Sequence, residues 1–433
     1  MQTKAFEIVK RLRDHGHQAV YAGGAVRDMV LGLEPSDVDI ATDARPEVVE
    51  SLFERTLPVG KAFGVIVVII DDVQVEVATF RTDGNYGDGR RPDFVTFSSM
   101  EEDAHRRDLT INGMFYDPIE EKIIDYVKGH EDMEGKVIRL IGDPEARIAE
   151  DKLRMLRVIR FAAKLGFSVD PLTLQAVKAH SSEITQVSAE RITEELQKIL
   201  RTGNYRMALD LLFETGLIGY ILPEVAAMKG CAQPVDYHPE GDVLTHTVLA
   251  LESLPADASD ELRMGTLLHD VGKPITQTFE GRIRFNGHDI RGKDLTREIM
   301  ARMKVSKDFS DRVVDLVGNH MKFMFVKEMR TSRLKRFMAT SFFEEHMALH
   351  RADCMSSHRN LENYDFVAEK LKTYEPEEIR PPRIVTGADL ISMGLVPGVL
   401  FKQILGDVED QQLEGVLKDR DQALEYVKSK WVV

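Results

Sequence analysis

The sequence predicts an α+β protein in which a small mixed sheet with helices forms an N-terminal head and all-α segments follow. Two patterns support this fold class. Short runs rich in β-branched residues alternate with helix-like segments up to about residue 140, and from Glu145 onwards apolar residues recur at helical spacing. The chain has 433 residues, more than the roughly 250 to 300 at which a single core stops growing, so we expect several domains.

The head is expected to alternate helices with short strands. An amphipathic pattern near residues 5–16 predicts the first helix, and Pro46 opens a later one that runs to about Arg55. The other expected elements are a strand at 18–22, a Gly-Gly turn, a helix at 25–31, a strand at 38–41, and a strand pair at 64–70 and 73–80 joined across Asp71-Asp72. Helical spacing returns at 145–167 and 171–202.

Turn-rich segments suggest where domains meet. They lie at Gly129–Gly142, at Gln233–Gly241, and at Pro376–Thr386 with its Pro381-Pro382 pair. We therefore predict four parts, which are a head at 1–140, a helical neck and body at 141–235, a second helical domain at 236–375, and a helical tail at 376–433.

Composition excludes some classes of protein. The chain is 43% hydrophobic and 30% charged, with apolar runs too short to span a membrane and no signal-like start, so we expect a cytoplasmic protein without a membrane partner. A net charge of -15 argues against a nucleic-acid binder that works by global attraction, so RNA binding would need local basic surface. Because Cys231 and Cys354 are the only cysteines, any metal must be held by His, Asp or Glu.

A first group of polar residues favours phosphate chemistry. Asp37-Val38-Asp39 places two carboxylates two residues apart on an expected strand, so both point to one face and together can hold Mg²⁺ ions. Gly23-Gly24 follows a strand and opens the helix that carries Arg27 and Asp28, which supplies N–H groups and a cation for a triphosphate. The alternatives are a surface carboxylate pair and an ordinary tight turn.

Six segments, in this order along the chain, resemble the class II tRNA nucleotidyltransferases and the related bacterial poly(A) polymerases, members of the polymerase-β-like superfamily. The resemblance covers about residues 15–235. The segments are Gly23-Gly24-Ala25-Val26-Arg27-Asp28, Leu31-Gly32, Asp37-Val38-Asp39-Ile40-Ala41-Thr42, Arg106-Arg107-Asp108-Leu109-Thr110-Ile111-Asn112, Glu150-Asp151-Lys152-Leu153-Arg154, and Glu190-Arg191 with Glu194-Glu195-Leu196.

The resemblance implies template-independent addition of CCA to tRNA 3′ ends from CTP and ATP, with Mg²⁺ in the head. Asp37 and Asp39 would be catalytic, and Glu76 resembles the third carboxylate near the metals, although it would serve equally as a polar position on a strand. The residues expected to bind the nucleotide are Gly23, Gly24, Arg27, Asp28, Arg107, Asp108, Asn112, Asp151, Arg154, Arg157 and Arg160.

Base choice can be argued from two of these residues. Asp151 and Arg154 stand at i and i+3, which on one helix gives them one face. The carboxylate accepts from the exocyclic amines of C or A and the guanidinium donates to their ring acceptors, so the pair would reject G and U. The alternative is an amphipathic helix with an intrahelical ion pair.

Two features help to decide which of the reactions known in this family the chain catalyses. The stretch Val59–Val65 lacks the Arg-rich segment usual in poly(A) polymerases, and the loop Arg81–Pro92, with Tyr86 and Asp88, resembles the element whose loss is associated with enzymes that stop after CC. We therefore expect full CCA addition. A-only addition, CC-only addition and poly(A) synthesis remain alternatives.

A second group indicates a metal site in the helical part. His269-Asp270 ends an apolar helix, and mixed imidazole and carboxylate ligands suit Mn²⁺, Ni²⁺, Fe²⁺, Mg²⁺ or Zn²⁺. With its neighbours the doublet resembles the HD phosphohydrolase superfamily. The resemblance implies a core metal set of His246, His269, Asp270 and Asp353, with His288 and His320 for a second metal or for phosphate.

The implied activity of this site is hydrolysis of phosphomonoesters or 2′,3′-cyclic phosphodiesters. A retained helical scaffold with buried histidines is the alternative. For the whole chain we also weigh a phosphohydrolase whose head only docks RNA, and a non-catalytic RNA-binding protein, which the clustered carboxylates and histidines disfavour. Neither the oligomeric state nor a role for the tail follows from the sequence.

Overall fold

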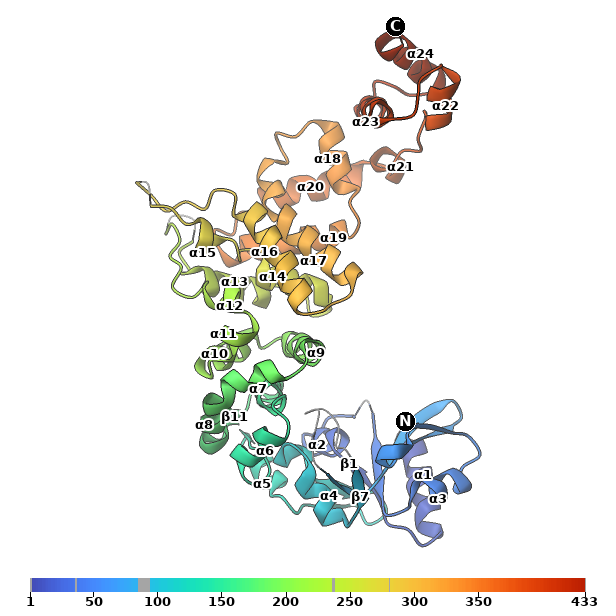
Figure 1. The fold of residues 1–433 in the computed structure, drawn as a ribbon, viewed down its shortest axis with the longest axis vertical. Coiled ribbons are helices and arrows are strands. Elements are labelled where there is room, and N and C mark those ends of the chain that lie inside the picture. The colour runs from blue at the N-terminus through green and yellow to red at the C-terminus, as the bar shows by residue number, and fades with distance from the viewer. Residues whose placement is uncertain (1, 36, 85–93, 236–237, 280, 433) are drawn as a thin grey trace. The chain divides into compact units, whose positions relative to one another are not determined.

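The computed structural model describes residues 2–35, 37–84, 94–235, 238–279 and 281–432 (Figure 1). Its contacts divide the chain into two compact units. The first comprises Met1–Ala226 with Arg302–Val305, and the second comprises Ala227–Ala301 with Ser306–Val433. The finer division into four domains stays a prediction.

The first unit contains a seven-stranded sheet in the order β3-β4-β5-β2-β1-β8-β9. Strands β2 and β5 run parallel and the other neighbours run antiparallel, so the sheet is mixed, as predicted. Its strands are β1 (Ala19–Ala22), β2 (Asp39–Thr42), β3 (Thr56–Gly60), β4 (Val65–Ile70), β5 (Val73–Thr79), β8 (Phe115–Asp117) and β9 (Lys122–Ile124). The early helices are α1 (Gln2–Asp14), α2 (Gly24–Val30) and α3 (Pro46–Leu52).

The hairpin between β4 and β5 confirms the expected strand pair and explains its turn. Asp71 and Asp72 both have positive φ, 48° and 63°. Two left-handed residues in succession form the kind of two-residue turn whose twist matches the flanking strands, and Asp tolerates that conformation. The core beneath the sheet gathers Val20, Phe80 and Phe115, with the two rings edge to face.

The sequence analysis did not predict the strands that lie away from the centre of the sheet. Strands β3, β8 and β9 are missing from it, and so are the separate pair β6 (Arg81–Asp83) and β7 (Val95–Phe97) and the helix α4 (Met100–Arg106). Most of these strands have three residues, too few to show an alternating pattern. Tyr86 and Asp88 of the loop between β6 and β7 lie outside the described residues.

The neck of the first unit is helical, but its helices are shorter than the hydrophobic spacing suggests. Segment 145–167 contains two helices, α6 (Pro144–Glu150) and α7 (Arg154–Leu165). Asp151 between them is extended, with φ -143° and ψ 106°, and its side chain accepts from the Leu153 N–H at 3.1 Å. Asp151 and Arg154 therefore do not share a helix, because the Asp side chain competes with the backbone for that N–H.

Further helices complete the neck. They are α8 (Pro171–His180), the 3₁₀ turn η3 (Ser181–Gln186), α9 (Ala189–Leu200), α10 (Tyr205–Glu214), α11 (Leu217–Ile221) and α12 (Pro223–Ala226). Helix α7 contacts both α9 and α10. Its buried face is apolar at helical spacing, with Leu156, Ile159 and Ala163 among the buried residues.

The second unit is built from helices in its described residues. The first group is α13 (Val243–Glu252), α14 (Asp260–Leu268), α15 (Lys273–Thr276), α16 (His288–Arg302), α17 (Lys307–Asn319), η4 (His320–Phe325), α18 (Thr331–Met338), α19 (Phe343–Ser356) and α20 (Glu362–Thr373). The tail adds α21 (Pro376–Ile379), α22 (Gly387–Ser392), α23 (Val399–Leu413) and α24 (Arg420–Trp431). The helical character of this part is as predicted.

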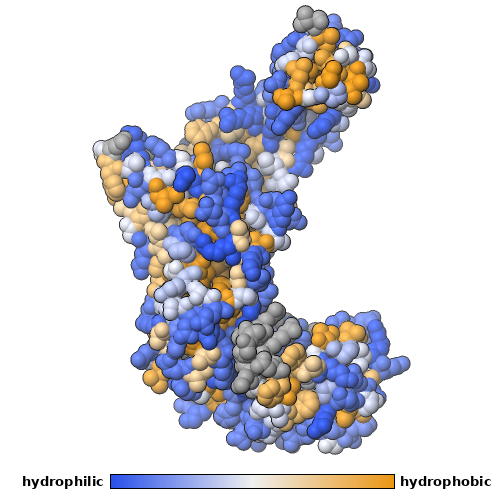
Figure 2. All heavy atoms as spheres, in the orientation of Figure 1, coloured by the Kyte–Doolittle hydropathy of each residue, from blue (hydrophilic) through white to orange (hydrophobic). Residues whose placement is uncertain are grey.

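The tail has a small core of its own and an apolar surface. Leu390, Ile404 and Val427 are buried in one cluster, and Trp431 packs against it. Apolar side chains also reach the outside of the tail (Figure 2). Among the described residues, none of the helices combines the length and the apolar character that crossing a lipid bilayer requires.

Gly272 packs so closely against α16 that we expect no side chain to be tolerated there. A Cβ atom at this position would lie 2.1 Å from the carbonyl oxygen of His288 and 2.7 Å from the nitrogen of Gly292. Gly272→Ala should lower the free energy of unfolding by at least about 2 kcal/mol, measured by urea denaturation of the metal-free protein.

Gly406 in α23 provides the matched control, since a Cβ atom at this position would meet nothing within 4 Å. Gly406→Ala should be neutral or stabilising, because Ala is favoured over Gly in a helix by about 1 kcal/mol. Equal unfolding midpoints for the two variants would contradict the packing described here.

Candidate active sites

Three carboxylates of the head share one face of the sheet. Asp37 and Asp39 are exposed while Val38 and Ile40 are buried, so the two acids point the same way even though β2 begins only at Asp39. The parallel register pairs Ile40 with Val77, and one residue earlier it places Asp39 beside Glu76, which is exposed on β5. The fold thus brings together the residues predicted to hold Mg²⁺.

The electrostatics of this face suit a cation. Although the Asp39 side chain is partly exposed at the surface, desolvation by the surrounding protein, the neighbouring Glu76 and, to a smaller extent, Asp37 raise its pKa to about 6, and Arg107 opposes them. Carboxylates that destabilise one another's charge are relieved by a bound divalent ion, and oxygen donors are what Mg²⁺ prefers. The donor set therefore fits the ion expected there.

A cavity of about 490 Å³ lies in the first unit, where the head meets the neck. It collects nearly all of the residues predicted to bind the nucleotide. The lining comprises Gly23, Gly24, Arg27, Arg81, Arg106, Arg107, Asp108, Asn112, Asp151, Leu153, Arg154, Arg157, Phe161 and Arg191. Its size and its many cations suit a nucleoside triphosphate.

Two predicted nucleotide-binding residues, Asp28 and Arg160, are not part of this lining. Asp28 accepts from the Arg27 guanidinium, with Nε at 2.9 Å and Nη2 at 2.6 Å. Arg160 pairs with the buried Glu195 of α9 at 2.8 Å. Asp28 therefore pairs with Arg27, which lines the cavity, and Arg160 of α7 pairs with Glu195 of α9 near it.

A chain of hydrogen bonds fixes the floor of the cavity. Arg27 Nη1 donates to Asn112 Oδ1 at 2.9 Å, Asn112 Nδ2 donates to Asp108 Oδ1 at 3.3 Å, and Arg157 Nε donates to Asp108 Oδ2 at 2.6 Å. Burial alone would raise the pKa of Asp108, but the Arg157 guanidinium holds that pKa below its usual value. Asp108 therefore stays ionised between the head and α7.

The proposed base-reading residues have partners that differ from the intrahelical pair considered above. Arg191 of α9 donates to Asp151 Oδ2 at 2.8 Å, while Arg154 donates to Glu150 Oε2 and to the Arg147 carbonyl, both at 2.6 Å. Asp151 and Arg154 nevertheless line the same cavity. Arg191 was recognised only as part of a motif, and no spacing in the sequence shows that it reaches Asp151.

In the second unit the six residues predicted for the HD-type site form one cluster. His246 Nε2 lies 3.0 Å from Asp353 Oδ1 and 3.3 Å from His269 Nε2, and His288 Nε2 lies 3.2 Å from His320 Nε2. Asp270 lies between the pairs, with Oδ2 3.3 Å from His269 Nε2 and Oδ1 3.5 Å from His288 Nε2. The ligand atoms of these six residues form two groups that could each hold an ion, namely His246, His269, Asp353 and Asp270, His288, His320. A third group, His238, Glu240 and His246, shares His246 with the first.

The histidines of the cluster are oriented as metal ligands require. Nδ1 of His269, His288 and His320 meets the backbone carbonyl of the residue three positions earlier at 2.7 to 2.8 Å. The hydrogen bond at Nδ1 leaves Nε2 free to ligate, and all four Nε2 atoms point to the cluster. Buried imidazoles and carboxylates with these second partners fit a divalent transition metal.

Lys273 adds a buried cation beside these ligands. Its Nζ lies 2.7 Å from Asp270 Oδ2 and also donates to Gln233 Oε1 at 2.7 Å. Burial would raise the pKa of Asp270, yet Lys273 and His269 hold that pKa well below its usual range. Burial and the neighbouring His288 lower the pKa of His320 to about 4, so its imidazole is neutral near pH 7. The sequence analysis did not single out Lys273, although it lies only three residues after Asp270.

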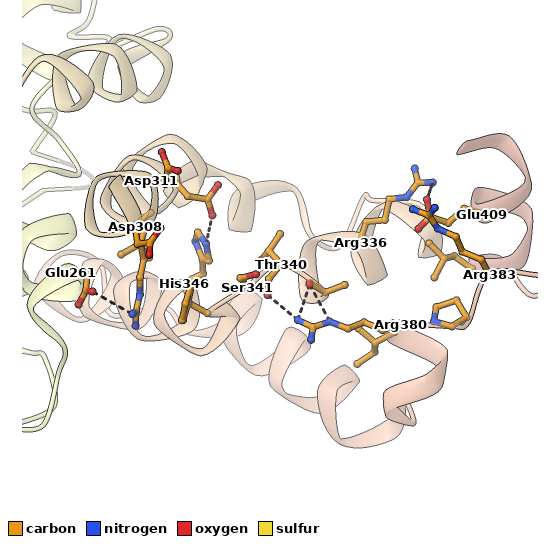
Figure 3. A pocket seen from close by; sticks show the side chains of 18 residues that line it. Glu261, Asp308, Asp311, Arg336, Thr340, Ser341, His346, Arg380, Arg383 and Glu409 are labelled. Atoms are coloured by element: carbon orange, nitrogen blue, oxygen red, sulfur yellow. Dashed lines mark hydrogen bonds and ion pairs between the residues drawn. The ribbon is translucent and has the colours of Figure 1, made fainter. Parts of the chain in front are cut away.

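A larger cavity of about 1010 Å³ lies elsewhere in the second unit (Figure 3). Acidic residues such as Asp308 and Asp311 lie at one end and Arg336 and Arg383 at the other. No residue of the predicted sites lines it. Several of its charges pair with one another, for example Arg336 with Glu409 at 2.9 Å, and we assign it no chemistry.

Three family models match the chain. Residues 19–139 match the poly A polymerase head domain, residues 166–229 match the "probable RNA and SrmB-binding site of polymerase A", and residues 237–393 match the HD domain. These matches agree with the resemblances drawn from the motifs.

The chain is also similar to proteins named CCA-adding enzyme. It is 48% identical over 215 residues to that of Bacillus subtilis, covering 49% of this chain and 54% of the relative, and 44% identical over 227 residues to that of Geobacillus stearothermophilus, covering 52% and 56%. The chain thus spans about half the length of the curated relatives it matches.

Solved structures cover more of the chain. A Bacillus stearothermophilus CCA-adding enzyme in complex with CTP aligns over 99% of this chain and 98% of its own, with a TM-score of 0.74 and 27% identity. A Thermotoga maritima CCA-adding enzyme complexed with tRNA aligns with a TM-score of 0.59 at 17% identity, over 99% and 94% of the chains, which shows a shared fold. The predicted architecture of a mixed head followed by helical parts is confirmed.

Proposed function

We propose, from the membership of residues 19–139 in the poly A polymerase head domain family and of residues 237–393 in the HD domain family, that this chain adds CCA to tRNA 3′ ends. CTP and ATP are the substrates and Mg²⁺ is the metal of the head. A second, separate site hydrolyses phosphoesters. The observation that carries the proposal is the single cavity that unites the phosphate-binding, sugar-binding and base-reading residues beside the head-to-neck connection.

In the transfer step the tRNA 3′-hydroxyl attacks the α-phosphate, and the bond to pyrophosphate breaks. Arg27 and Arg107 orient the triphosphate. Gly23 has a φ of 68°, and a Cβ there would lie 3.3 Å from the Arg107 guanidinium, so the absence of a side chain leaves room for that guanidinium beside the turn. Asp37, Asp39 and Glu76 would hold the divalent cations, which would supply activation of the hydroxyl and neutralisation of charge on the leaving group. Asp108 and Asn112 position the sugar.

Selection of C and A follows from the fixed partners of the base-reading residues. Asp151 is held by Arg191 and Arg154 by Glu150, so acceptor and donors stay in place as the base changes. A carboxylate accepts from the amine of C or A, whereas U and G present an oxygen at the equivalent position and are repelled. The protein itself then serves as the template.

Full CCA addition is favoured over A-only addition, CC-only addition and poly(A) synthesis because the relatives that match the head carry the name CCA-adding enzyme. The HD-type cluster supports phosphomonoester or 2′,3′-cyclic phosphodiester hydrolysis, with Mn²⁺, Ni²⁺, Fe²⁺, Mg²⁺ or Zn²⁺ as the ion. We place the protein in the cytoplasm, where tRNA is processed.

Loss of a head carboxylate should abolish transfer and leave RNA binding intact. Asp39→Ala removes a cation ligand, so incorporation of CMP and AMP into tRNA that lacks its 3′ end should fall by about a thousandfold or more. The affinity for tRNA should change little. Near-normal incorporation by the variant would remove Asp39 from catalysis and would favour a head that only docks RNA.

Loss of the base-reading carboxylate should relax nucleotide choice. Asp151→Ala should cost about 1 to 3 kcal/mol of discrimination, seen as higher relative kcat/KM for UTP and GTP. Thr185→Ala offers a control in the same neck, because its hydroxyl only caps a local turn by donating to the Ser182 carbonyl. If the relative kcat/KM values of the four triphosphates in Asp151→Ala match those of the wild type, Asp151 does not read the base and serves only to hold Arg191.

The two sites should be separable, because their ligands lie in different units. Replacing His269 and Asp270 with Ala removes one ligand from each of the two groups formed by the six predicted residues, so hydrolysis of a 2′,3′-cyclic nucleotide or a phosphomonoester should vanish. Addition of C and A should persist within about tenfold of wild type, allowing for packing losses. Wild-type protein that hydrolyses neither substrate with any of the five metals would show that the cluster is a scaffold.

A further inference from the structure

His246 is held differently from the other histidines of the HD-type cluster. His269 and His320 cap the ends of α14 and α17 and His288 begins α16, so each Nδ1 finds a backbone carbonyl near a helix end. His246 is the fourth residue of α13, and the Val243 carbonyl three residues earlier already accepts the Thr247 hydroxyl at 2.9 Å. Its Nδ1 therefore depends on an acceptor from outside the helix.

Glu240 supplies that acceptor from the segment that precedes α13. Glu240 Oε1 lies 2.8 Å from His246 Nδ1, and the carboxylate side chain is only 7% exposed. Ser356 Oγ lies 3.2 Å from the same nitrogen, and because its hydroxyl donates to the Asp353 carbonyl at 2.8 Å it can only accept from His246, as a second, uncharged acceptor. Glu240 is thus the charged partner of His246 on the side away from the ligand cluster.

His238 fixes the carboxylate in turn. Its Nδ1 lies 2.9 Å from the same Oε1 atom, and its ring stands edge-on to that of His246, with centroids 5.0 Å apart. The chain then turns through Gly241, whose φ of 128° favours glycine, into Asp242, which caps α13 by accepting from the Thr245 N–H at 2.8 Å. Glu240 Oε1 therefore contacts both His238 and His246, and the segment that carries it is anchored to α13 by the Asp242 cap.

We infer that Glu240 is a positioning residue for the metal site, holding the proton of His246 on Nδ1 so that the Nε2 lone pair faces His269, Asp270 and Asp353. A carboxylate on the far nitrogen also makes the imidazole a stronger donor than a carbonyl would. The inference rests on the proposed metal-dependent function of this cluster. It assigns a role to a residue that the motif and the resemblance left aside.

The test measures Mn²⁺ binding to the full chain by isothermal titration calorimetry. All proteins carry Asp37→Ala and Asp39→Ala, so that the head carboxylates do not contribute. In this parent we compare Glu240→Gln, Glu240→Ala and His238→Ala, with His269→Ala as loss of a ligand. Asp315→Asn is the matched control, because Asp315 pairs with His346 Nε2 at 2.9 Å and neither residue belongs to the cluster.

A positioning role predicts an ordered loss of affinity at constant stoichiometry. Glu240→Gln keeps an acceptor without the charge and should weaken Mn²⁺ about tenfold, and Glu240→Ala about a hundredfold. His238→Ala should have a smaller effect and Asp315→Asn none. A merely structural role would instead lower the number of sites without changing Kd.

Two further results would overturn the inference, and they differ. If both Glu240 variants bind Mn²⁺ with the wild-type Kd while His269→Ala still weakens binding, the metal site exists but Glu240 does not position it. Absence of any Mn²⁺ binding that depends on His269 would overturn the metal site itself and the inference with it.

Discussion

The ion pair between the part-buried Asp108 carboxylate and Arg157 is the interaction on which the nucleotide cavity depends. The carboxylate accepts from Asn112, which belongs to the head, and from Arg157, which belongs to α7 of the neck. An ionised carboxylate buried in this way is tolerated only while the guanidinium faces it, because an unpaired buried charge is strongly destabilising. The pair therefore fixes α7, and with it Arg154 and Phe161, against the Gly-Gly turn and Arg27.

The HD-type cluster also brings buried polar groups together, and most of them are imidazoles. Its side chains are mostly buried, and each histidine directs one nitrogen to a fixed acceptor and the other to a common centre. Several of these groups pair with one another, as His246 does with Asp353 and Lys273 with Asp270. The clustering of four Nε2 atoms and two carboxylates suits the metal-binding function proposed for it.

The fold class could be predicted from the sequence, and most of the residues proposed for each site lie close together in the structure. Period-two alternation predicted that Asp37 and Asp39 point to the same face. The structure shows both side chains on that face, although the strand β2 begins only at Asp39. The six residues of the HD-type cluster, spread from His246 to Asp353, came from motif resemblance and lie together in the structure. The chemical roles given to these residues remain predictions.

The features that were missed depend on tertiary contacts or on single backbone angles. Helical spacing continues through Asp151, and only the hydrogen bond of its side chain to the Leu153 N–H shows why the helix stops there. Arg191 meets Asp151 across 40 residues of chain, and Glu240 meets His246 through a segment without periodicity. Such pairs are set by the packing of helices, which no local pattern encodes.

A double-mutant cycle at Asp108 and Arg157, read out as CTP affinity, tests the central claim most directly. Asp108→Asn and Arg157→Gln would each leave the other residue of the pair with an uncompensated charge, whereas the double variant removes both charges. The account predicts that the two losses fail to add, with a coupling free energy of at least about 1 kcal/mol. Losses that add to within about 0.3 kcal/mol would contradict it, because the pair would then not be what shapes the cavity.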